Sequence, residues 1–397
     1  MNSGDRIRVL FVVPFLNEAS GWLTACRGMI DSVANTGAVE AALAIGKEDE
    51  RAARELFPDF PIRSLPSIYR ADYSHPRTWI TAVRSAFEAR FRSTGGRRID
   101  LVHSFEAYPA GWIGHLFARA SRVPHVITAV GTYSVRWSRA NPLDRSLYRR
   151  ALAGASCVSS ISHATLQRLR GGLGANLPSV PYRVNLLGID SHENDALSDA
   201  VGKREAPVLL TVGAIKRRKG HDIALRAFFR VCERYPDAEY RVIGKIADLD
   251  FFDELQTLVT EKGSRGVKFL GSVSGEELQR HYCEASVFVL TSRDVGEKFE
   301  GFGLVCLEAG RFGVPVVATD SGGLSEAVRD GVTGLVVEAE DVDGVARGIT
   351  RLLDSPELAR SLGRANRSWA RKLSWSRFAR EQLEIYEDCL GAAVERL

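Results

Sequence analysis

The feature of this sequence that most constrains its fold is a regular alternation of short β-branched runs with longer stretches of helical spacing. In the first half of the chain, the runs lie at residues 7–13, 39–45, 99–103, 125–129, 156–161 and 182–187. They are almost continuously apolar, which is typical of parallel strands that helices cover on both faces. The pattern therefore predicts an α/β fold in which crossover helices connect the strands of a doubly wound parallel sheet.

The alternation stops once and then begins again. Residues 188–206 are polar, with scattered Gly, Asp and Ser, as expected of a linker. Since the chain has 397 residues, about twice the usual length of one domain, two domains are expected. Further runs follow at residues 207–212, 240–243, 267–270, 287–291, 314–319 and 334–337. We therefore predict two doubly wound α/β domains facing each other across a cleft, over residues 1–190 and 207–372, with a linker at 191–206.

The end of the chain has the pattern of an amphipathic helix. Ser374 is a suitable N-cap, and Phe378, Leu383, Tyr386 and Leu390 follow at helical spacing. We expect residues 373–397 to form a closing helix that packs back on the N-terminal domain.

Composition and charge exclude several classes of protein. A content of 45% hydrophobic and 26% charged residues is that of a globular chain and excludes fibrous and disordered proteins. The net charge of +4 is too slight for a nucleic-acid-binding surface, so no nucleic-acid partner is expected.

Cysteine usage and apolar runs bear on the location of the protein. The six cysteines show no paired C-x-x-C spacing, which favours reduced thiols in a cytoplasmic protein over a zinc site or a disulfide framework. No apolar run approaches the roughly 18 to 20 residues of a membrane-spanning helix. Residues 8–16 resemble a secretion signal, but Asp5 and the absence of a small-residue cleavage site favour a first buried strand.

The most informative motif is the segment 300–308, which follows an expected strand. Gly301 and Gly303 allow a close backbone approach, and a helix is expected to begin at Leu304. The free amides at such a helix start bind anions. Glu300 before the helix and Glu308 on its second turn can accept hydrogen bonds from two separated sets of hydroxyls, such as those of a sugar and a ribose. Either Glu alone is compatible with a solvated surface position.

A second motif, at residues 212–220, follows the first strand of the second domain. Gly213 occupies the strand-to-loop turn. Four cationic side chains follow it at a position suited to a diphosphate, because guanidinium groups bind phosphate bidentately and lysine acts as a point charge. A solvated basic turn is the alternative. The four are Lys216, Arg217, Arg218 and Lys219.

These motifs resemble those of the retaining nucleotide-sugar glycosyltransferases of family 4, which have the GT-B architecture of two Rossmann-like domains. The pattern V-G-R-L-x-x-x-K-G is matched by residues 212–220, the E-x7-E element by Glu300 and Glu308, and G-V-P-V-V-A-T-D-x-G-G-x-x-E by residues 313–326. The resemblance is specific over residues 207–337 and weaker over the first domain.

The resemblance implies roles for individual residues. Lys219 contacts the donor diphosphate, Glu300 bonds the transferred sugar, and Glu308 holds the ribose hydroxyls. Amides of Gly301, Phe302, Gly303 and Leu304 meet sugar and phosphate, Ser272 and Val273 lie beside the nucleobase, and the loop after the first strand retains Gly21 of a Gly-Gly pair that closes on donor and acceptor.

Three positions depart from the family pattern. Ala214 replaces an arginine, and we hypothesise that Arg217 or Arg218 restores its phosphate contact. Leu187 replaces an asparagine. Val130, beside Gly131, stands where a histidine usually meets the outer hydroxymethyl of the sugar, so we predict a 6-deoxysugar or pentose donor, since a buried hydroxyl without a partner costs about 1 to 3 kcal/mol.

Two weaker candidates leave alternatives open. His103 follows a strand and either lines the cleft or is a hydrogen-bonded structural histidine. Gly322 and Gly323 follow another strand and either approach the ligand or permit a tight turn.

Arginines and aromatic residues interleave over residues 77–92 and 136–150. Such stretches in the acceptor-binding domain either dock on an anionic membrane or pack on their own sheet. A lipid-linked acceptor would place the protein peripherally at the inner membrane face.

The sequence thus predicts a metal-independent, retaining glycosyltransferase that needs no cofactor besides its nucleotide-sugar co-substrate and that acts on a carbohydrate or lipid-linked acceptor. A catalytically impaired nucleotide-sugar-binding scaffold is the alternative, because Val130, Leu187 and Ala214 depart from the pattern. A phosphorylase or an epimerase of the same architecture is a third possibility, without a signature in the sequence.

Overall fold

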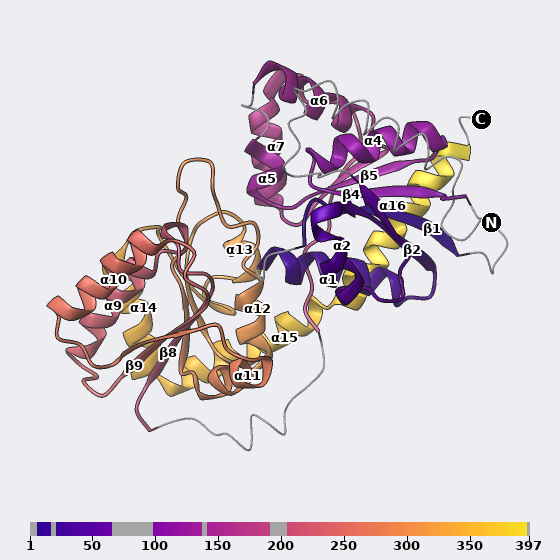
Figure 1. Cartoon of the computed structure of the whole chain (residues 1–397). Helices are drawn as coiled ribbons and strands as arrows, with labels where there is room; N and C mark the ends of the chain where they lie inside the picture. Colours follow the sequence, from indigo (N-terminus) through magenta and orange to yellow (C-terminus); the bar gives the residue numbers. More distant parts are fainter. Residues whose placement is uncertain (1–5, 17–20, 66–97, 137–140, 191–204, 395–397) are drawn as a thin grey trace. The chain divides into compact units, whose positions relative to one another are not determined.

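The computed structural model describes residues 6–16, 21–65, 98–136, 141–190 and 205–394 (Figure 1). Its chain divides into two compact units, Met1–Leu187 together with Trp375–Leu397, and Gly188–Ser374. Of the linker expected at residues 191–206, residues 191–204 lie outside the described residues. The whole arginine-rich stretch 77–92 also lies outside them.

The first unit is built on a seven-stranded sheet in the order β3-β2-β1-β4-β5-β6-β7, in which all neighbours are parallel. Its strands are β1 (Ile7–Val12), β2 (Val39–Gly46), β3 (Ile62–Leu65), β4 (Leu101–Phe105), β5 (His125–Ala129), β6 (Cys157–Ser160) and β7 (Tyr182–Val184). Its helices are α1 (Gly21–Ala34), α2 (Glu50–Leu56), α4 (Ala110–Ser121), α5 (Thr132–Val135), α6 (Pro142–Ala153), α7 (His163–Leu173) and α16 (Trp375–Val394).

The last helix, α16, lies among the earliest elements of the chain, beside α1 and the strands of the first unit (Figure 1). A Cβ on Gly28 of α1 would come within 2.1 Å of the Trp375 ring, so glycine is what allows this close approach. In the sheet, His103 bonds the Tyr386 hydroxyl of α16 at 2.6 Å and Thr128 Oγ1 at 2.7 Å. Burial lowers the pKa of His103 to about 3, so the ring is neutral. Of the two readings of His103, the structure supports the structural one.

The second unit has a six-stranded parallel sheet in the order β10-β9-β8-β11-β12-β13. Its strands are β8 (Val208–Val212), β9 (Glu239–Ile243), β10 (Val267–Gly271), β11 (Val287–Leu290), β12 (Val316–Thr319) and β13 (Gly334–Val337). Its helices are α9 (His221–Cys232), α10 (Leu249–Glu261), α11 (Gly275–Glu284), α12 (Leu304–Arg311), α13 (Leu324–Ala327), α14 (Val342–Asp354) and α15 (Pro356–Lys372).

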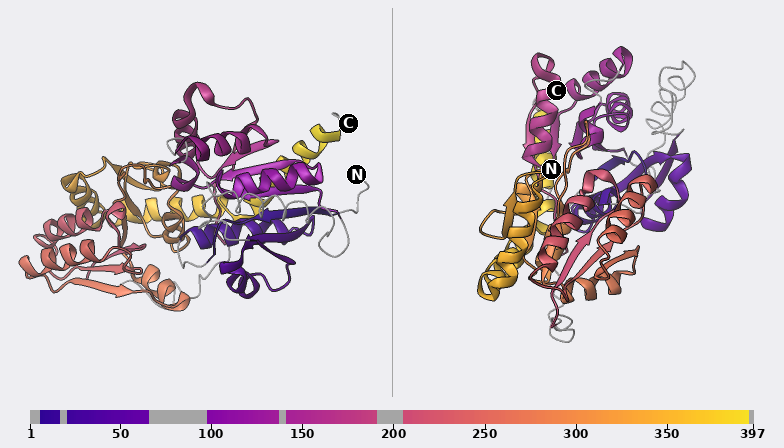
Figure 2. Two further views of the ribbon diagram at one scale, coloured as in Figure 1. Left: turned by 45° about the horizontal axis from the view of Figure 1, so that its top comes forward. Right: turned by 90° about the vertical axis from the view of Figure 1, so that its left-hand side faces the viewer.

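The prediction of two Rossmann-like α/β units with parallel sheets is confirmed. Every predicted strand is present, with ends shifted by a few residues, and helices pack on the faces of both sheets (Figure 2). Edge strand β3 (Ile62–Leu65) was not predicted, because two of its four residues are polar and only Leu65 is buried.

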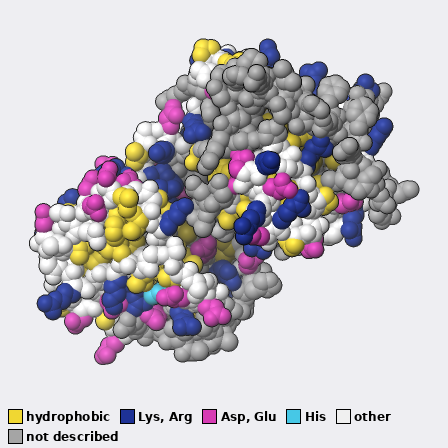
Figure 3. Space-filling view, viewed as in Figure 1, with side chains coloured by type: hydrophobic (Ala, Val, Ile, Leu, Met, Phe, Trp, Pro, Cys, Tyr) yellow, Lys and Arg dark blue, Asp and Glu magenta, His cyan; other side chains and the backbone are white. Residues whose placement is uncertain are grey.

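The surface carries both signs of charge. Figure 3 shows Lys and Arg interspersed with Asp and Glu on the face that it presents, as the small net charge of the sequence suggests. Within the described ranges, no helix is long and apolar enough to cross a membrane.

Candidate functional site

The carboxyl edge of the second sheet gathers the loops that carry the sequence motifs. Because all strands are parallel, the loops after β8, β11 and β12 leave the sheet at the same edge, where ligands of such sheets bind. The loop after β8 contains a short 3₁₀ turn, η5 (Arg217–Lys219), and the loop after β11 ends at Gly303, the N-cap of α12. Both predicted motifs therefore meet at one place.

Gly220 fastens the first of these loops to the second. It has a left-handed backbone with φ +66°, and a Cβ there would lie 1.8 Å from the carbonyl oxygen of Thr291. In return, Thr291 Oγ1 donates a hydrogen bond of 2.7 Å to the carbonyl of Gly220. Only glycine permits both the conformation and the contact.

Glu300 is the centre of the cluster that these loops form. One of its oxygens, Oε2, accepts hydrogen bonds from Lys219 Nζ at 2.6 Å, Arg218 Nη1 at 2.9 Å and Ser292 Oγ at 3.0 Å. Burial alone raises the pKa of the Glu300 carboxyl, but the charges and hydrogen bonds of Lys219 and Arg218 outweigh burial and hold the pKa well below its usual range. The carboxylate is therefore ionised at neutral pH, and Oε1 has no hydrogen-bond donor among the described residues.

Gly322 and Gly323 support this cluster from behind. The Gly323 amide donates to the carbonyl of Glu300 at 2.9 Å. A Cβ on Gly322, which has φ +58°, would lie 2.0 Å from the same carbonyl. Of the two readings given above, the structure supports a tight turn packed against the Glu300 backbone.

The start of α12 directly follows Glu300. Gly303 adopts φ +88° at the N-cap, and no side chain caps the helix. A Cβ on Gly303 would lie 2.3 Å from the Leu324 side chain, so glycine is required here as well. Phe302 is buried, and Gly301 and Leu304 are partly exposed. No side chain of the described residues caps the start of α12, which suits the binding of an anion beside Lys219.

Glu308 lies on the second turn of α12 and is held separately from Glu300. Its Oε2 accepts a 2.9 Å hydrogen bond from the Tyr282 hydroxyl of α11, and the Tyr282 ring stacks on Phe312. Burial raises the pKa of Glu308, while the bond from Tyr282 opposes the rise. The half-buried carboxyl is positioned by one neutral donor.

The other predicted residues of this unit lie around the cluster. Gly213 lies beside Lys219: a Cβ on Gly213 would lie 3.5 Å from Lys219 Cε, an ordinary van der Waals distance. Ser272, which is exposed, and Val273, which is half-buried, follow β10 on the same edge. Arg217 turns away to Glu254 at 2.5 Å. The structure therefore brings Arg218, and not Arg217, to Glu300.

The predicted residues of the first domain belong to the other unit. Gly21 is exposed at the start of α1, and residues 17–20 before it lie outside the described residues. Val130 is half-buried and donates its amide to Ser134 Oγ at 2.9 Å, while Gly131, with φ +93°, is the N-cap of α5. These residues follow β1 and β5 and are not part of the Glu300 cluster.

Sequence reasoning missed two contributors, Ser292 and Tyr282. Ser292 follows β11 directly, and polar Thr291 and Ser292 at the end of an apolar run were an available signal. Tyr282 lies in a helix and had no signal of its own. Within the part of the chain that the structure describes, no group of three or more His, Cys, Asp or Glu is placed to hold a metal ion.

Comparison with known proteins identifies the class. The chain matches the family of Glycosyl transferases group 1 over residues 194–369 and the Glycosyl transferase 4-like domain over residues 20–188. A GDP-mannose-dependent alpha-(1-6)-phosphatidylinositol monomannoside mannosyltransferase of Mycolicibacterium smegmatis is 31% identical over 329 residues, 81% of this chain and 81% of that protein. A D-inositol 3-phosphate glycosyltransferase of Saccharomonospora viridis is 29% identical over 377 residues, 89% of this chain and 85% of that protein.

Solved structures show the same fold. A glycosyltransferase from Rickettsia africae has a TM-score of 0.79 at 19% identity, covering 98% of this chain and 99% of that one. HepE of Anabaena, crystallised with UDP and glucose, has a TM-score of 0.74 at 17% identity, covering 96% and 100%. Fold and site thus define a GT-B nucleotide-sugar glycosyltransferase. Within that class, the chain belongs to the glycosyltransferases of the family 4 type, and it uses a nucleotide-sugar donor.

Gly220→Ala should destabilise the second unit more than Gly331→Ala. Gly331 has the same backbone, φ +67° against +66°, but a Cβ there meets nothing within 4 Å. Gly331→Ala should therefore lower the free energy of unfolding by about 1 to 2 kcal/mol, the cost of a left-handed alanine. Gly220→Ala should cost at least twice as much, because Thr291 must move. Urea denaturation of both variants measures the difference in the free energy of unfolding. An equal loss of stability in the two variants would contradict a close contact between Gly220 and Thr291.

Proposed function

We propose that this glycosyltransferase transfers its sugar with retention of configuration and without a metal ion, and that Glu300 and Lys219 are its catalytic residues. The observation that carries the proposal is the convergence of Lys219 and Arg218 on Glu300 directly before the start of α12. Two cations and free helix amides are suited to the negative charge that develops on a departing diphosphate.

In the proposed reaction, the bond between the anomeric carbon and the diphosphate oxygen breaks. The acceptor oxygen forms its bond to the same face of that carbon, and its proton passes to the leaving phosphate. Lys219 and Arg218 bind the diphosphate. Glu300 accepts a hydrogen bond from a sugar hydroxyl through Oε1, the oxygen that has no donor among the described residues. Glu308, beside Tyr282, accepts hydrogen bonds from the ribose hydroxyls. Ser272 and Val273 contact the nucleobase.

The donor sugar is proposed from Val130 and from the relatives. The names of the mycobacterial relatives specify GDP-mannose, and HepE was crystallised with UDP and glucose. We keep the prediction that Val130 disfavours a sugar with a hydroxyl at its outer carbon. A donor panel therefore has to pair each hexose with its 6-deoxy counterpart.

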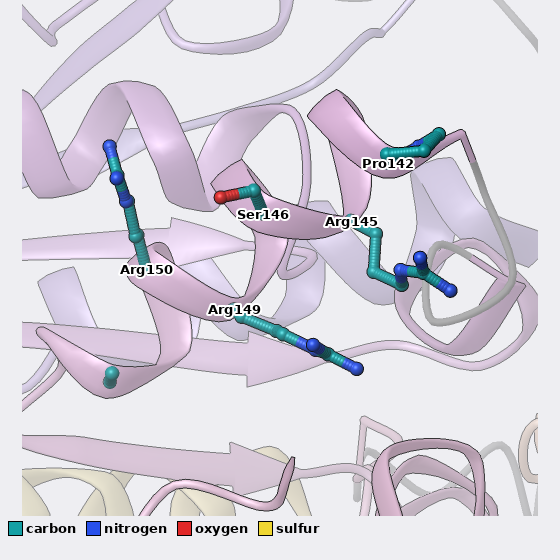
Figure 4. Close-up of a pocket in the computed structure, with 6 residues that line it drawn as sticks. Pro142, Arg145, Ser146, Arg149 and Arg150 are labelled. Atoms are coloured by element: carbon teal, nitrogen blue, oxygen red, sulfur yellow. The ribbon is translucent and has the colours of Figure 1, made fainter.

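The acceptor is proposed to carry a phosphate group. The relatives are named for phosphatidylinositol monomannoside and for D-inositol 3-phosphate, and both compounds contain phosphate. In the first unit, a hollow along α6 is lined by Pro142, Arg145, Ser146, Arg149, Arg150 and Ala153 (Figure 4). No carboxylate of the described residues forms an ion pair with the arginines of this hollow. Asp144, on the same helix, accepts hydrogen bonds from Tyr108 and Asn141 instead.

This arginine-lined hollow also fits a membrane surface. Leu143 at the start of α6 is 41% exposed, so an apolar side chain stands beside the cations. Arginine with exposed apolar side chains is the combination that binds anionic lipid surfaces. We therefore propose a cytoplasmic protein that contacts the inner face of a membrane through α6.

Glu300→Gln should abolish most diphosphate release from a nucleotide sugar. The variant removes the charge that positions Lys219 and Arg218, and a loss of about 100-fold in kcat is expected. The assay uses GDP-mannose, UDP-glucose and their 6-deoxy counterparts, with and without phosphatidylinositol mannoside. Glu261→Gln, an exposed residue at the end of α10, serves as the control. Nucleoside diphosphate binding without any turnover by the wild type would support a scaffold instead.

Arg218→Ala should weaken the binding of a nucleoside diphosphate, whereas Arg217→Ala should not. Arg218 lies at Glu300, and Arg217 pairs with Glu254. Loss of a hydrogen bond to a charged group costs roughly 1.5 to 3 kcal/mol, or about 10- to 100-fold in Kd. Calorimetric titration with UDP, GDP and ADP gives both affinities. The same Kd for wild type and Arg218→Ala would reject this role.

The double variant Arg145→Ala, Arg149→Ala should bind anionic vesicles more weakly than the wild type. Each basic side chain near such a surface contributes about 1 kcal/mol, so a loss of roughly 30-fold is expected. Co-sedimentation with phosphatidylinositol-containing and with neutral vesicles measures it. The double variant Arg360→Ala, Arg364→Ala on α15 changes the charge equally and should behave as the wild type. The membrane contact is excluded if anionic vesicles do not bind the wild type.

A further inference from the structure

The first unit contains a buried carboxyl group that the proposed function does not use. Glu106 directly follows β4 at the carboxyl edge of the seven-stranded sheet. Its side chain is completely buried, and neither carboxyl oxygen has a hydrogen-bond partner among the described residues. Its backbone is left-handed, with φ +71°, although it is not glycine. Such a residue is costly to the fold in two independent ways.

Comparison with similar residues shows how unusual Glu106 is. The other described non-glycine residues with positive φ, Arg122 and Glu340, are exposed to solvent. Glu300, the buried carboxylate of the second unit, has three donors on one oxygen. Glu106 has the strained backbone, which costs about 1 to 2 kcal/mol, and lacks the donors. A buried polar group without partners at a strained position suggests a functional site.

The surroundings of Glu106 are those of a ligand-binding edge. Strand β4 lies between β1 and β5, so Glu106 lies at the same edge as Gly21 and Val130. Its amide continues the ladder by donating to the carbonyl of Thr128 at 2.8 Å. The preceding Phe105 packs edge-to-face against Trp22 of α1, with 6.4 Å between ring centroids. Ligands of doubly wound sheets bind beyond these strand ends.

The burial of Glu106 favours a neutral ligand that can donate hydrogen bonds to it. Burial raises the pKa of Glu106 well above its usual range, and the positive charge of Arg136 opposes the rise. Arg136 repels a cationic ligand, and burying an anion beside an acidic group is unfavourable. Hydroxyl groups satisfy both carboxyl oxygens without adding charge, and two neighbouring hydroxyls on a ring match the two oxygens.

We propose that Glu106 binds two neighbouring hydroxyls of a sugar or cyclitol ring at the carboxyl edge of the first unit. The inference rests on the proposed function in that the ring belongs either to the transferred sugar of the donor or to the acceptor. Glu106 is a binding residue for this ring, and its cost to the fold is offset when the hydroxyls are bound.

The test compares Glu106→Gln and Glu106→Met with the wild type in the full-length chain. Glu106→Met has a similar length and no polar atoms, so it should raise the thermal midpoint by a few degrees, because a buried group without partners is removed. Both variants should lower kcat/KM at least 10-fold. A higher KM only for the nucleotide sugar of the donor panel that the wild type turns over fastest would assign the ring to the donor, and a higher KM for phosphatidylinositol mannoside alone would assign it to the acceptor. A variant with wild-type kcat and both wild-type KM values would overturn the inference while leaving the proposed function intact.

A binding measurement keeps the inference testable if the wild type shows no turnover, which would count against the proposed function only. D-mannose and myo-inositol are titrated separately into the wild type and Glu106→Met, and saturation-transfer NMR reports binding. Loss of at least 10-fold in affinity for either ring in the variant supports the hydroxyl site. Equal binding by both proteins, or no binding by either, overturns it.

Discussion

The second unit depends on one interaction, the convergence of Lys219, Arg218 and Ser292 on a single oxygen of buried Glu300. A carboxylate that is removed from water is stable only when charges and hydrogen bonds replace its hydration. Three donors at 2.6 to 3.0 Å supply that replacement. The loops after β8 and β11 therefore cannot vary independently, since one brings both cations and the other brings the carboxylate.

The backbone around this cluster follows from the need to bring loops into contact. Gly220 packs against Thr291, Gly322 against the carbonyl of Glu300, and Gly303 against Leu324. At each of these positions a Cβ would clash with the neighbouring atom. All three glycines have positive φ. They are needed for two reasons at once, backbone conformation and close approach, and this explains why glycines mark the segments that carry the chemistry.

The sequence predicted the fold well because near-continuous apolar runs have few alternatives. Strand β5 begins and ends at the residues that the pattern predicted. Strand β3 was missed because a sequence reveals a run of apolar residues but does not reveal the pairing of a short strand at the edge of a sheet. At the candidate site, the glycines and the spacing of Glu300 and Glu308 indicated segments that the structure places at the carboxyl edge of the second sheet. The hydrogen bond from Tyr282 to Glu308 and the separation of Arg217 from Arg218 depend on side-chain directions, which neighbouring sequence positions do not determine.

The charges of the cluster are consistent with the proposal that it binds a diphosphate and releases it. Lys219 and Arg218 contribute +2 and Glu300 contributes −1, so the ligand-free cluster has a net charge of +1. Because the Glu300 carboxylate accepts hydrogen bonds from both Lys219 and Arg218, its single negative charge neutralises their two positive charges only in part. In the proposed reaction, a diphosphate competes with Glu300 Oε2 for the nitrogen atoms of Lys219 and Arg218, while Oε1 faces no such competition. Since two cations without a carboxylate would bind a leaving diphosphate more tightly, the proposed role of Glu300 includes weakening product binding as well as positioning the sugar.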